Sequence, residues 1–167
     1  MLVDSIEIRV RKEDAMKYIF RKTPLISKID QFNRKVEGIH LEYVEYKILK
    51  YEIISRKKNK NNFRNDDIKH TIIMMVNTYN GHSKSIDCIP QTVKRYIARG
   101  CIKKSSIDEN YIIEKVKTEI LNHFDTKIKH NPIDKHIIKN ISLLEVNSIY
   151  KPYWIGNYNG KEVFVDA

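Results

Sequence analysis

Cysteine, glycine and proline are all scarce in this sequence. The two cysteines, Cys88 and Cys101, form no paired CxxC spacing, which excludes a disulfide framework and favours buried free thiols in a reducing compartment. Five glycines and four prolines exclude a collagen-like or linker-like chain. A chain of 167 residues can therefore fold around its own apolar core without a disulfide or a metal.

Long apolar stretches and a leader segment are missing as well. The longest purely apolar run, from Ile72 to Val76, is far too short to cross a bilayer. The first residues contain no basic segment followed by an apolar stretch, so we expect no secretory signal. These absences predict a soluble cytoplasmic protein that does not associate with membranes.

Signatures of catalysis, metal binding and cofactor binding are also lacking. The six histidines share no i, i+4 helical spacing and no zinc-ligand spacing, and there is no glycine-rich phosphate loop. We therefore predict no catalytic residue, no metal and no cofactor. A third alternative is an enzyme built on Cys88 with His82, or on Asp87 with Asp166. It requires the two members of the pair to lie close together in space.

The chain is strongly basic, with a net charge of +10. Clustered Lys and Arg side chains neutralise phosphates, and an aromatic ring can stack on a base. One stretch combines both features and predicts nucleic-acid binding as an alternative function. It contains Arg56, Lys57, Lys58, Lys60, Phe63 and Arg64. The competing interpretation is a solvated loop in a chain whose Lys, Ile and Asn content reflects an AT-rich genome.

A short motif occurs twice along the chain. Tyr79-Asn80-Gly81 reappears as Tyr158-Asn159-Gly160, and at the same distance after each glycine comes a β-branched residue followed by Asp, in Ile86-Asp87 and Val165-Asp166. Asn-Gly between apolar residues is typical of a tight β-hairpin. The repetition therefore predicts an internally duplicated fold.

The fold class that this repetition predicts is α+β, with two tandem repeats. Each repeat is a helix packed on an antiparallel sheet that ends in an Asn-Gly hairpin. We expect the first repeat at residues 1–90, with residues 56–67 as a basic loop insertion, and the second repeat, preceded by a linker helix, at residues 91–167.

Hydrophobic periodicity, prolines and capping residues predict the individual elements. In the first repeat we expect a strand at 6–10, a helix at 12–22, a helix started by Pro24, and strands at 39–55 and 68–79. In the second repeat we expect a linker helix from Pro90 to Gly100, a long helix opened by a capping box of Ser106 and Glu109, a helical turn after Asn131-Pro132, and an extended segment at 141–158.

Two-residue loops would fix the register of both hairpins. Met75 would then face Ile86 in the first hairpin, and Trp154 would face Val165 in the second. Both faces of the second hairpin carry apolar residues, so we expect each face to be covered by another part of the protein.

The end of the chain reads Tyr150-Lys151-Pro152-Tyr153-Trp154, then Tyr158-Asn159-Gly160 and Val165-Asp166-Ala167. This pattern resembles the "YxPYW…VDA" strand-hairpin of small uncharacterised bacterial domains of the PepSY-like or cystatin-like kind. The resemblance covers residues 149–167. It implies a helix against a curled antiparallel sheet and a binding or regulatory role without catalysis. The first copy departs from the pattern, with Ile73-Met74-Met75 where Pro-Tyr-Trp would fall.

The function that we predict is a non-catalytic binding or protein-interaction module, acting on a protein partner or by self-association. Aromatic residues dominate the binding energy of many interfaces, so the candidate interface is the aromatic sheet face of Tyr150, Tyr153, Trp154 and Phe164. The alternative is a nucleic-acid-binding accessory protein that uses the basic loop.

Overall fold

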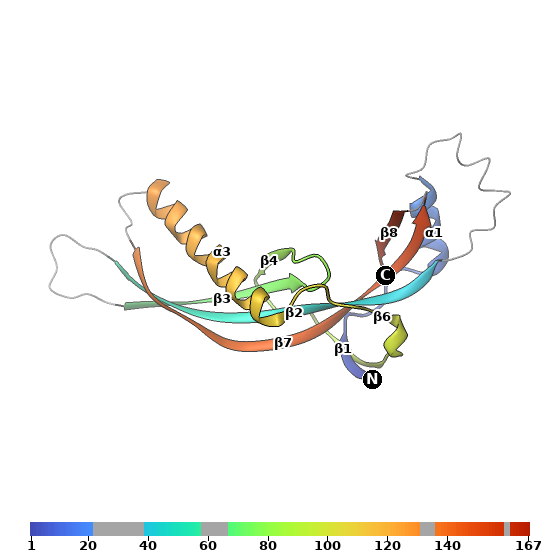
Figure 1. Cartoon of the computed structure of the whole chain (residues 1–167), viewed down its shortest axis with the longest axis horizontal. Coiled ribbons are helices and arrows are strands. Elements are labelled where there is room, and N and C mark those ends of the chain that lie inside the picture. The colour runs from blue at the N-terminus through green and yellow to red at the C-terminus, as the bar shows by residue number, and fades with distance from the viewer. Residues whose placement is uncertain (22–38, 58–66, 131–135, 159–160) are drawn as a thin grey trace. The chain divides into compact units, whose positions relative to one another are not determined.

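The computed structural model describes residues 1–21, 39–57, 67–130, 136–158 and 161–167 (Figure 1). These residues form two α-helices, eight strands and one short 3₁₀ helix. In chain order they are β1 (Leu2–Ser5), α1 (Lys12–Arg21), β2 (His40–Lys57), β3 (Asp67–Asn77), β4 (Ser83–Ile86), β5 (Val93–Tyr96), η1 (Arg99–Cys101), β6 (Ile102–Lys103), α3 (Glu109–His130), β7 (His136–Tyr158) and β8 (Lys161–Asp166).

The strands form one mixed eight-stranded sheet, which confirms the α+β class. Its main order is β4-β3-β2-β7-β1-β5, with β6 paired to β2 and β8 paired to β7. The β1–β7 and β2–β6 pairs are parallel. The order of the described elements shows no clear tandem repeat, so the predicted duplication is not seen at the level of topology.

The chain divides into two compact units, and each combines segments that are distant in the sequence. The first unit comprises Met1–Glu45, Gln91–Lys104 and Ile149–Ala167; the second comprises Tyr46–Pro90 and Ser105–Ser148. Both units therefore draw on residues from either side of position 90, where the sequence predicts the boundary between repeats.

The second unit has one continuous apolar core between α3 and its strands. Ile112, Val116 and Ile120 recur at helical spacing on α3 and are buried, as the sequence predicts. They pack on alternate residues of the strands, which share one face of the sheet. These strand residues are Leu49, Tyr51, Ile53, Met74 and Val76.

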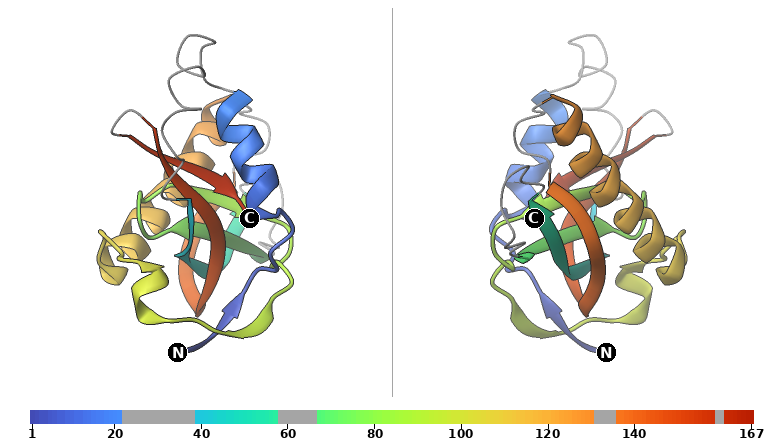
Figure 2. Two further views of the ribbon diagram at one scale, coloured as in Figure 1. Left: turned by 90° about the vertical axis from the view of Figure 1, so that its right-hand side faces the viewer. Right: turned by 90° about the vertical axis from the view of Figure 1, so that its left-hand side faces the viewer.

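The first unit has two smaller apolar clusters. In one, Ala15 and Ile19 of α1 pack against Ile39 and Val165; Figure 2 shows α1 beside β8. The other consists of Val3, Tyr43 and Ile97, with half-buried neighbours around it. The helix at 12–22 is confirmed, and its buried stripe is the one that the sequence indicates.

Two predicted elements near β1 and β5 are wrong. The first strand is Leu2–Ser5, earlier than the predicted 6–10. The predicted linker helix from Pro90 to Gly100 is instead the strand β5 followed by η1. The reason is tertiary: β5 pairs antiparallel with β1, from Leu2 opposite Tyr96 to Ser5 opposite Val93, and this pairing overrides a marginal helical pattern.

The first hairpin is present, but its predicted register is wrong by two residues. Ile86 lies opposite Ile73, not Met75. The side-chain oxygen of Asn77 accepts the N–H groups of Tyr79 and Asn80, at 2.9 and 3.3 Å, so an Asx-type turn lengthens the loop to residues 78–81. Because a shift of two residues preserves side-chain direction, the faces remain as predicted.

The second hairpin has the predicted register. Trp154 lies opposite Val165, and Tyr153 lies opposite Asp166. Strands β2, β3 and β7 also match the predicted extended segments within a few residues. The predicted helix from Pro24, the turn after Asn131-Pro132 and most of the basic loop lie outside the described residues.

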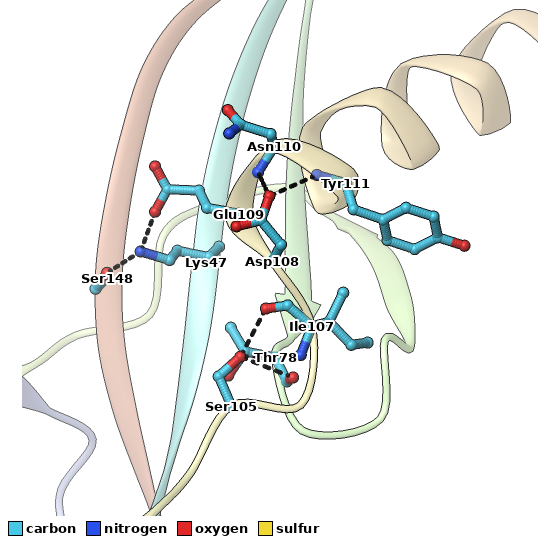
Figure 3. Close-up of polar contacts among 9 residues, drawn as sticks. All are labelled: Lys47, Thr78, Ser105, Ile107, Asp108, Glu109, Asn110, Tyr111 and Ser148. Atoms are coloured by element: carbon cyan, nitrogen blue, oxygen red, sulfur yellow. Dashed lines mark hydrogen bonds and ion pairs between the residues drawn. The ribbon is translucent and has the colours of Figure 1, made fainter.

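Helix α3 is capped by a residue other than the predicted one. A carboxylate oxygen of Asp108 accepts the N–H groups of Asn110 and Tyr111, at 2.9 and 3.4 Å (Figure 3), which is the geometry of an N-cap. The Ser106 hydroxyl instead donates to the carbonyl of Tyr79. The capping box of Ser106 and Glu109 is therefore wrong. Neither described helix has the length and apolarity that crossing a membrane requires.

Candidate functional site

A groove in the second unit lies between α3, β3 and β4. We name it the α3–β4 groove. Its volume is about 440 Å³, within the range of sites that bind small molecules or peptide side chains. Its apolar part is formed by Ile72, Met74, Ile120 and Phe124, and its polar part by Ser83, Lys84, Ser85, Glu119 and His123.

The groove exists because two small residues occupy the face of β4 that points to α3. Ser83 and Ser85 lie opposite Val76 and Met74, and directly opposed residues share a face of the sheet. Val76 and Met74 belong to the core beneath α3. A serine side chain fills far less space than theirs, so the core ends at β3 and a hollow remains over β4.

One end of the groove is closed by contacts between the β3–β4 turn and α3. The Lys115 ammonium donates to the carbonyl of Gly81 at 2.8 Å, and the Ser83 hydroxyl donates to Glu119. Gly81 has a φ of 70°, and a Cβ there would lie 2.7 Å from Ile107. Only glycine therefore allows this close approach. His123, further along α3, is exposed, so the groove opens to solvent at that end.

A lysine and a serine are in contact near the start of α3, and lysine–serine pairs catalyse hydrolysis in some enzymes. The Lys47 ammonium donates to the Ser148 hydroxyl at 3.0 Å and also pairs with the Glu109 carboxylate (Figure 3). A carboxylate in contact favours the charged ammonium. The Lys47 ammonium therefore bridges Ser148 and Glu109, and the three side chains tie α3 to β2 and β7.

The predicted aromatic interface lies in the first unit, and its members contact different neighbours. The Trp154 indole N–H donates to the Val10 carbonyl at 2.8 Å, and its ring packs on the α1 cluster. Tyr153 is buried and meets Phe164 edge to face, with ring centroids 5.8 Å apart. Tyr150 packs on the cluster of Val3, Tyr43 and Ile97. Their role in contacting a partner stays a prediction.

Charged side chains surround these rings. The Lys103 ammonium lies 2.7 Å from the Glu162 carboxylate and 3.7 Å from the Glu42 carboxylate, and 5.6 Å from the centre of the Phe164 ring. The other Glu42 oxygen contacts His40 at 2.9 Å. Lys103 is therefore the centre of an ion-pair network that sequence reasoning missed, because its members come from three distant segments.

The predicted nucleic-acid site can be described only at its first residue. Arg56 pairs with Asp67 at 2.8 Å, and Lys139 lies 3.4 Å from the same carboxylate. The hydrogen bond from Arg56, with the nearby positive charges, lowers the pKa of Asp67. Arg56 is thus already paired with a carboxylate. The structure describes the backbone of Lys57 and not its side chain. The other residues of the stretch lie outside the described ranges: Lys58, Lys60, Phe63 and Arg64.

The remaining cysteine and aspartate candidates are exposed, half-buried or ion-paired. Cys88 is exposed, which contradicts the expectation of a buried thiol, and Cys101 is half-buried. Asp166 pairs with Lys151 at 2.7 Å, and Asp87 is exposed. Within the described ranges there is no group of three or more His, Cys, Asp or Glu side chains that could hold a metal ion.

Comparison of the chain with models of protein families, with curated proteins and with solved structures gives no match. The functional conclusion therefore depends on the geometry of the two units. Among the described residues, those of the α3–β4 groove join an apolar surface to polar groups beside an exposed strand. Its sequence signal, two serines flanking a lysine on a short strand, is too common to identify a site.

Proposed function

We propose that this protein is a non-catalytic binding module that holds part of a partner protein in the α3–β4 groove of its second unit. The observation that carries the proposal is the groove itself, with its apolar part from β3 and α3 and its polar rim from β4 and α3. Concave, mostly apolar sites with a few polar groups are the usual form of binding sites.

Two further observations support a binding role. The groove is held open by the fold, because the β3–β4 turn is fixed to α3 by Lys115 and Glu119, and a preformed site loses little entropy on binding. The polar contact at its rim, from the Ser83 hydroxyl to the Glu119 carboxylate, joins β4 to α3. The contacts of Lys47 with Ser148 and Glu109 join α3 to β2 and β7.

The experiment is a selection of peptides from a random display library on the full chain. Ser85→Phe places a large ring in the groove and should abolish the binding of selected peptides. The matched control is Thr71→Phe, which adds the same ring at an exposed residue of β3 whose side chain alternates with that of Ile72 and so lies on the other face. Both variants are checked by far-UV circular dichroism. Peptides that bind both variants equally would contradict the proposal.

A further inference from the structure

We infer, on the basis of the function proposed above, that the partner contributes an extended polypeptide segment that adds to the sheet along the free edge of β4. Alternate side chains of this segment enter the α3–β4 groove. Addition of a strand to an exposed sheet edge is a general mode of peptide recognition, in which backbone hydrogen bonds give affinity and pockets give specificity.

The backbone of β4 presents unpaired groups in the right direction. β4 ends the strand order and, in the part of the chain that the structure describes, pairs only with β3. The Asn77 N–H donates to the His82 carbonyl at 2.9 Å, so this is a hydrogen-bonded pair. Such pairs alternate with non-hydrogen-bonded ones in an antiparallel ladder. The N–H and C=O groups of Ser83 and Ser85 therefore point away from β3, towards the free edge.

The same two residues direct a bound strand into the groove. A residue of an added strand shares a face with the residue opposite to it. Ser83 and Ser85 line the groove, so the partner residues opposite them point their side chains beneath α3. Those partner residues are two apart, as strand alternation requires. The edge that offers hydrogen bonds and the hollow that accepts side chains thus belong to one site.

The charges around β4 specify the chemistry of the segment. Its residue opposite Ser83 lies beside the Glu119 carboxylate, which favours a basic or hydrogen-bond-donating side chain. Its next residue lies opposite Lys84, which is exposed, and this favours an acidic side chain. Its residue opposite Ser85 faces Met74 and Phe124, which favours an apolar one. The expected pattern is basic, acidic, apolar along the strand.

Ester substitution in the selected peptides tests the strand pairing. Replacing one backbone amide at a time by an ester removes the N–H and keeps the side chain. We expect esters at every second residue to weaken binding about tenfold and the intervening esters to change it less than about twofold. Groove-dependent peptides that tolerate esters at every position would overturn strand addition and leave the proposed function standing. A library with no peptide that Ser85→Phe blocks would overturn both.

A proline in β4 removes the backbone N–H that the protein itself would donate to the bound segment. Ser85→Pro deletes an N–H that points to the free edge, and proline is tolerated at such edge positions. We expect Ser85→Pro to weaken peptide binding about tenfold relative to Ser85→Ala, which removes the same hydroxyl and keeps the N–H. Equal affinities of the two variants would overturn the inference. If Ser85→Pro lowers the urea midpoint, Ser83→Pro is compared with Ser83→Ala instead, because both variants lose the hydroxyl that contacts Glu119.

Self-association is the competing occupant of this edge. Sedimentation of the full chain at increasing concentration measures it directly. A monomer at all concentrations agrees with a separate partner. A dimer that Ser85→Phe disrupts and Thr71→Phe does not would show that a second copy occupies β4, and would overturn the assignment to a different polypeptide.

Discussion

The two compact units each contain a strand at one end of the sheet order, and these edges differ. β4 in the second unit combines Ser83 and Ser85 with a groove beside it. β5 in the first unit carries adjacent cations, Lys94 and Arg95, and a Tyr96 side chain that is 83% exposed. Charged side chains on an edge strand oppose pairing with other chains. β4 carries a single cation, Lys84, between its two serines, and we propose that a partner strand joins the edge beside the groove.

The backbone of β5 nevertheless directs N–H and C=O groups towards its outer edge, as the backbone of β4 does. Met1 and Ile97 exchange two hydrogen bonds of 2.9 Å, so the next pair, Leu2 with Tyr96, is not hydrogen-bonded, and Tyr96 directs its N–H and C=O outward. Two copies of β5 paired antiparallel would place Lys94 against Arg95, which is repulsive. Edge geometry is therefore the same in both units, and the side chains make the difference.

The cores of the units differ as well. The second unit has one continuous cluster beneath α3, whereas the first has two small clusters and the ion-pair network around Lys103. The single tryptophan of the chain, Trp154, lies in the first unit. Trp154 fluorescence therefore reports on the first unit, and far-UV circular dichroism of α3 reports largely on the second.

The largest effect is expected from Leu49→Ala. Leu49 is completely buried in the core of the second unit, and leucine-to-alanine changes at such positions cost about 3 kcal/mol of unfolding free energy. Urea denaturation followed by circular dichroism measures this loss. If Trp154 fluorescence keeps its wild-type midpoint, the units unfold separately; a common shift would show that they unfold together.

Alkaline pH should destabilise the second unit through Tyr51. Burial, with a smaller effect of Glu114, raises the pKa of the Tyr51 hydroxyl from 10.0 to about 12, and this hydroxyl donates to the Ile113 carbonyl. The neutral form is favoured in the folded state, so its stabilisation is present below pH 10 and is lost as pH rises towards 12. The loss is about 2 to 3 kcal/mol. The free energy of unfolding of Tyr51→Phe should fall less steeply as pH rises above 10. A pH profile identical to that of the wild type would contradict this role of Tyr51.

Gly81→Ala should loosen the turn that closes the groove. The positive φ and the contact with Ile107 both disfavour a Cβ, with an expected cost of about 2 kcal/mol. Thermal unfolding of the variant measures the cost. The matched control is Gly100→Ala, where a Cβ meets no atom within 4 Å; equal losses in the two variants would show that crowding and φ at Gly81 do not matter.

The smallest effects are expected from two ion-pair variants of the first unit, Lys103→Met and its control Lys94→Met. Glu42 and Glu162 would lose their shared cation, and among the described residues the half-buried Glu42 carboxylate would keep its contact with His40. We expect a loss of about 1 kcal/mol, read by Trp154 fluorescence. Lys94→Met removes the exposed pair with Asp4 and should change stability by less than about 0.5 kcal/mol. The opposite ranking would mean that the network adds nothing to stability.

Local patterns in the sequence predicted the parts of the fold that depend on neighbouring residues. The buried stripe of α3 and the register of the second hairpin follow from helical spacing and from Asn-Gly. The first hairpin differed because the Asn77 side chain competes for the backbone N–H groups of the turn. The cap of α3 differed because Asp108 is a better placed acceptor than Ser106.

Features that depend on distant segments could not be predicted. Val93–Tyr96 becomes a strand because it meets β1, which lies some ninety residues earlier in the chain. The α3–β4 groove arises because two serines of β4 lie beneath a helix that comes later in the sequence. Nothing in the sequence around Ser83 and Ser85 distinguishes them from surface serines, because only the folded position of α3 makes them part of a groove. The sequence therefore did not predict this groove, and the aromatic residues that it did indicate pack within the first unit.

The exposure of Cys88 has a practical consequence for measurements on β4. This thiol lies two residues beyond the end of that strand, and Cys101 is less accessible. A maleimide dye should therefore attach selectively beside the strand edge and change its emission when the edge is occupied. The same accessibility permits copies to cross-link in air, so sedimentation has to be carried out with a reductant present.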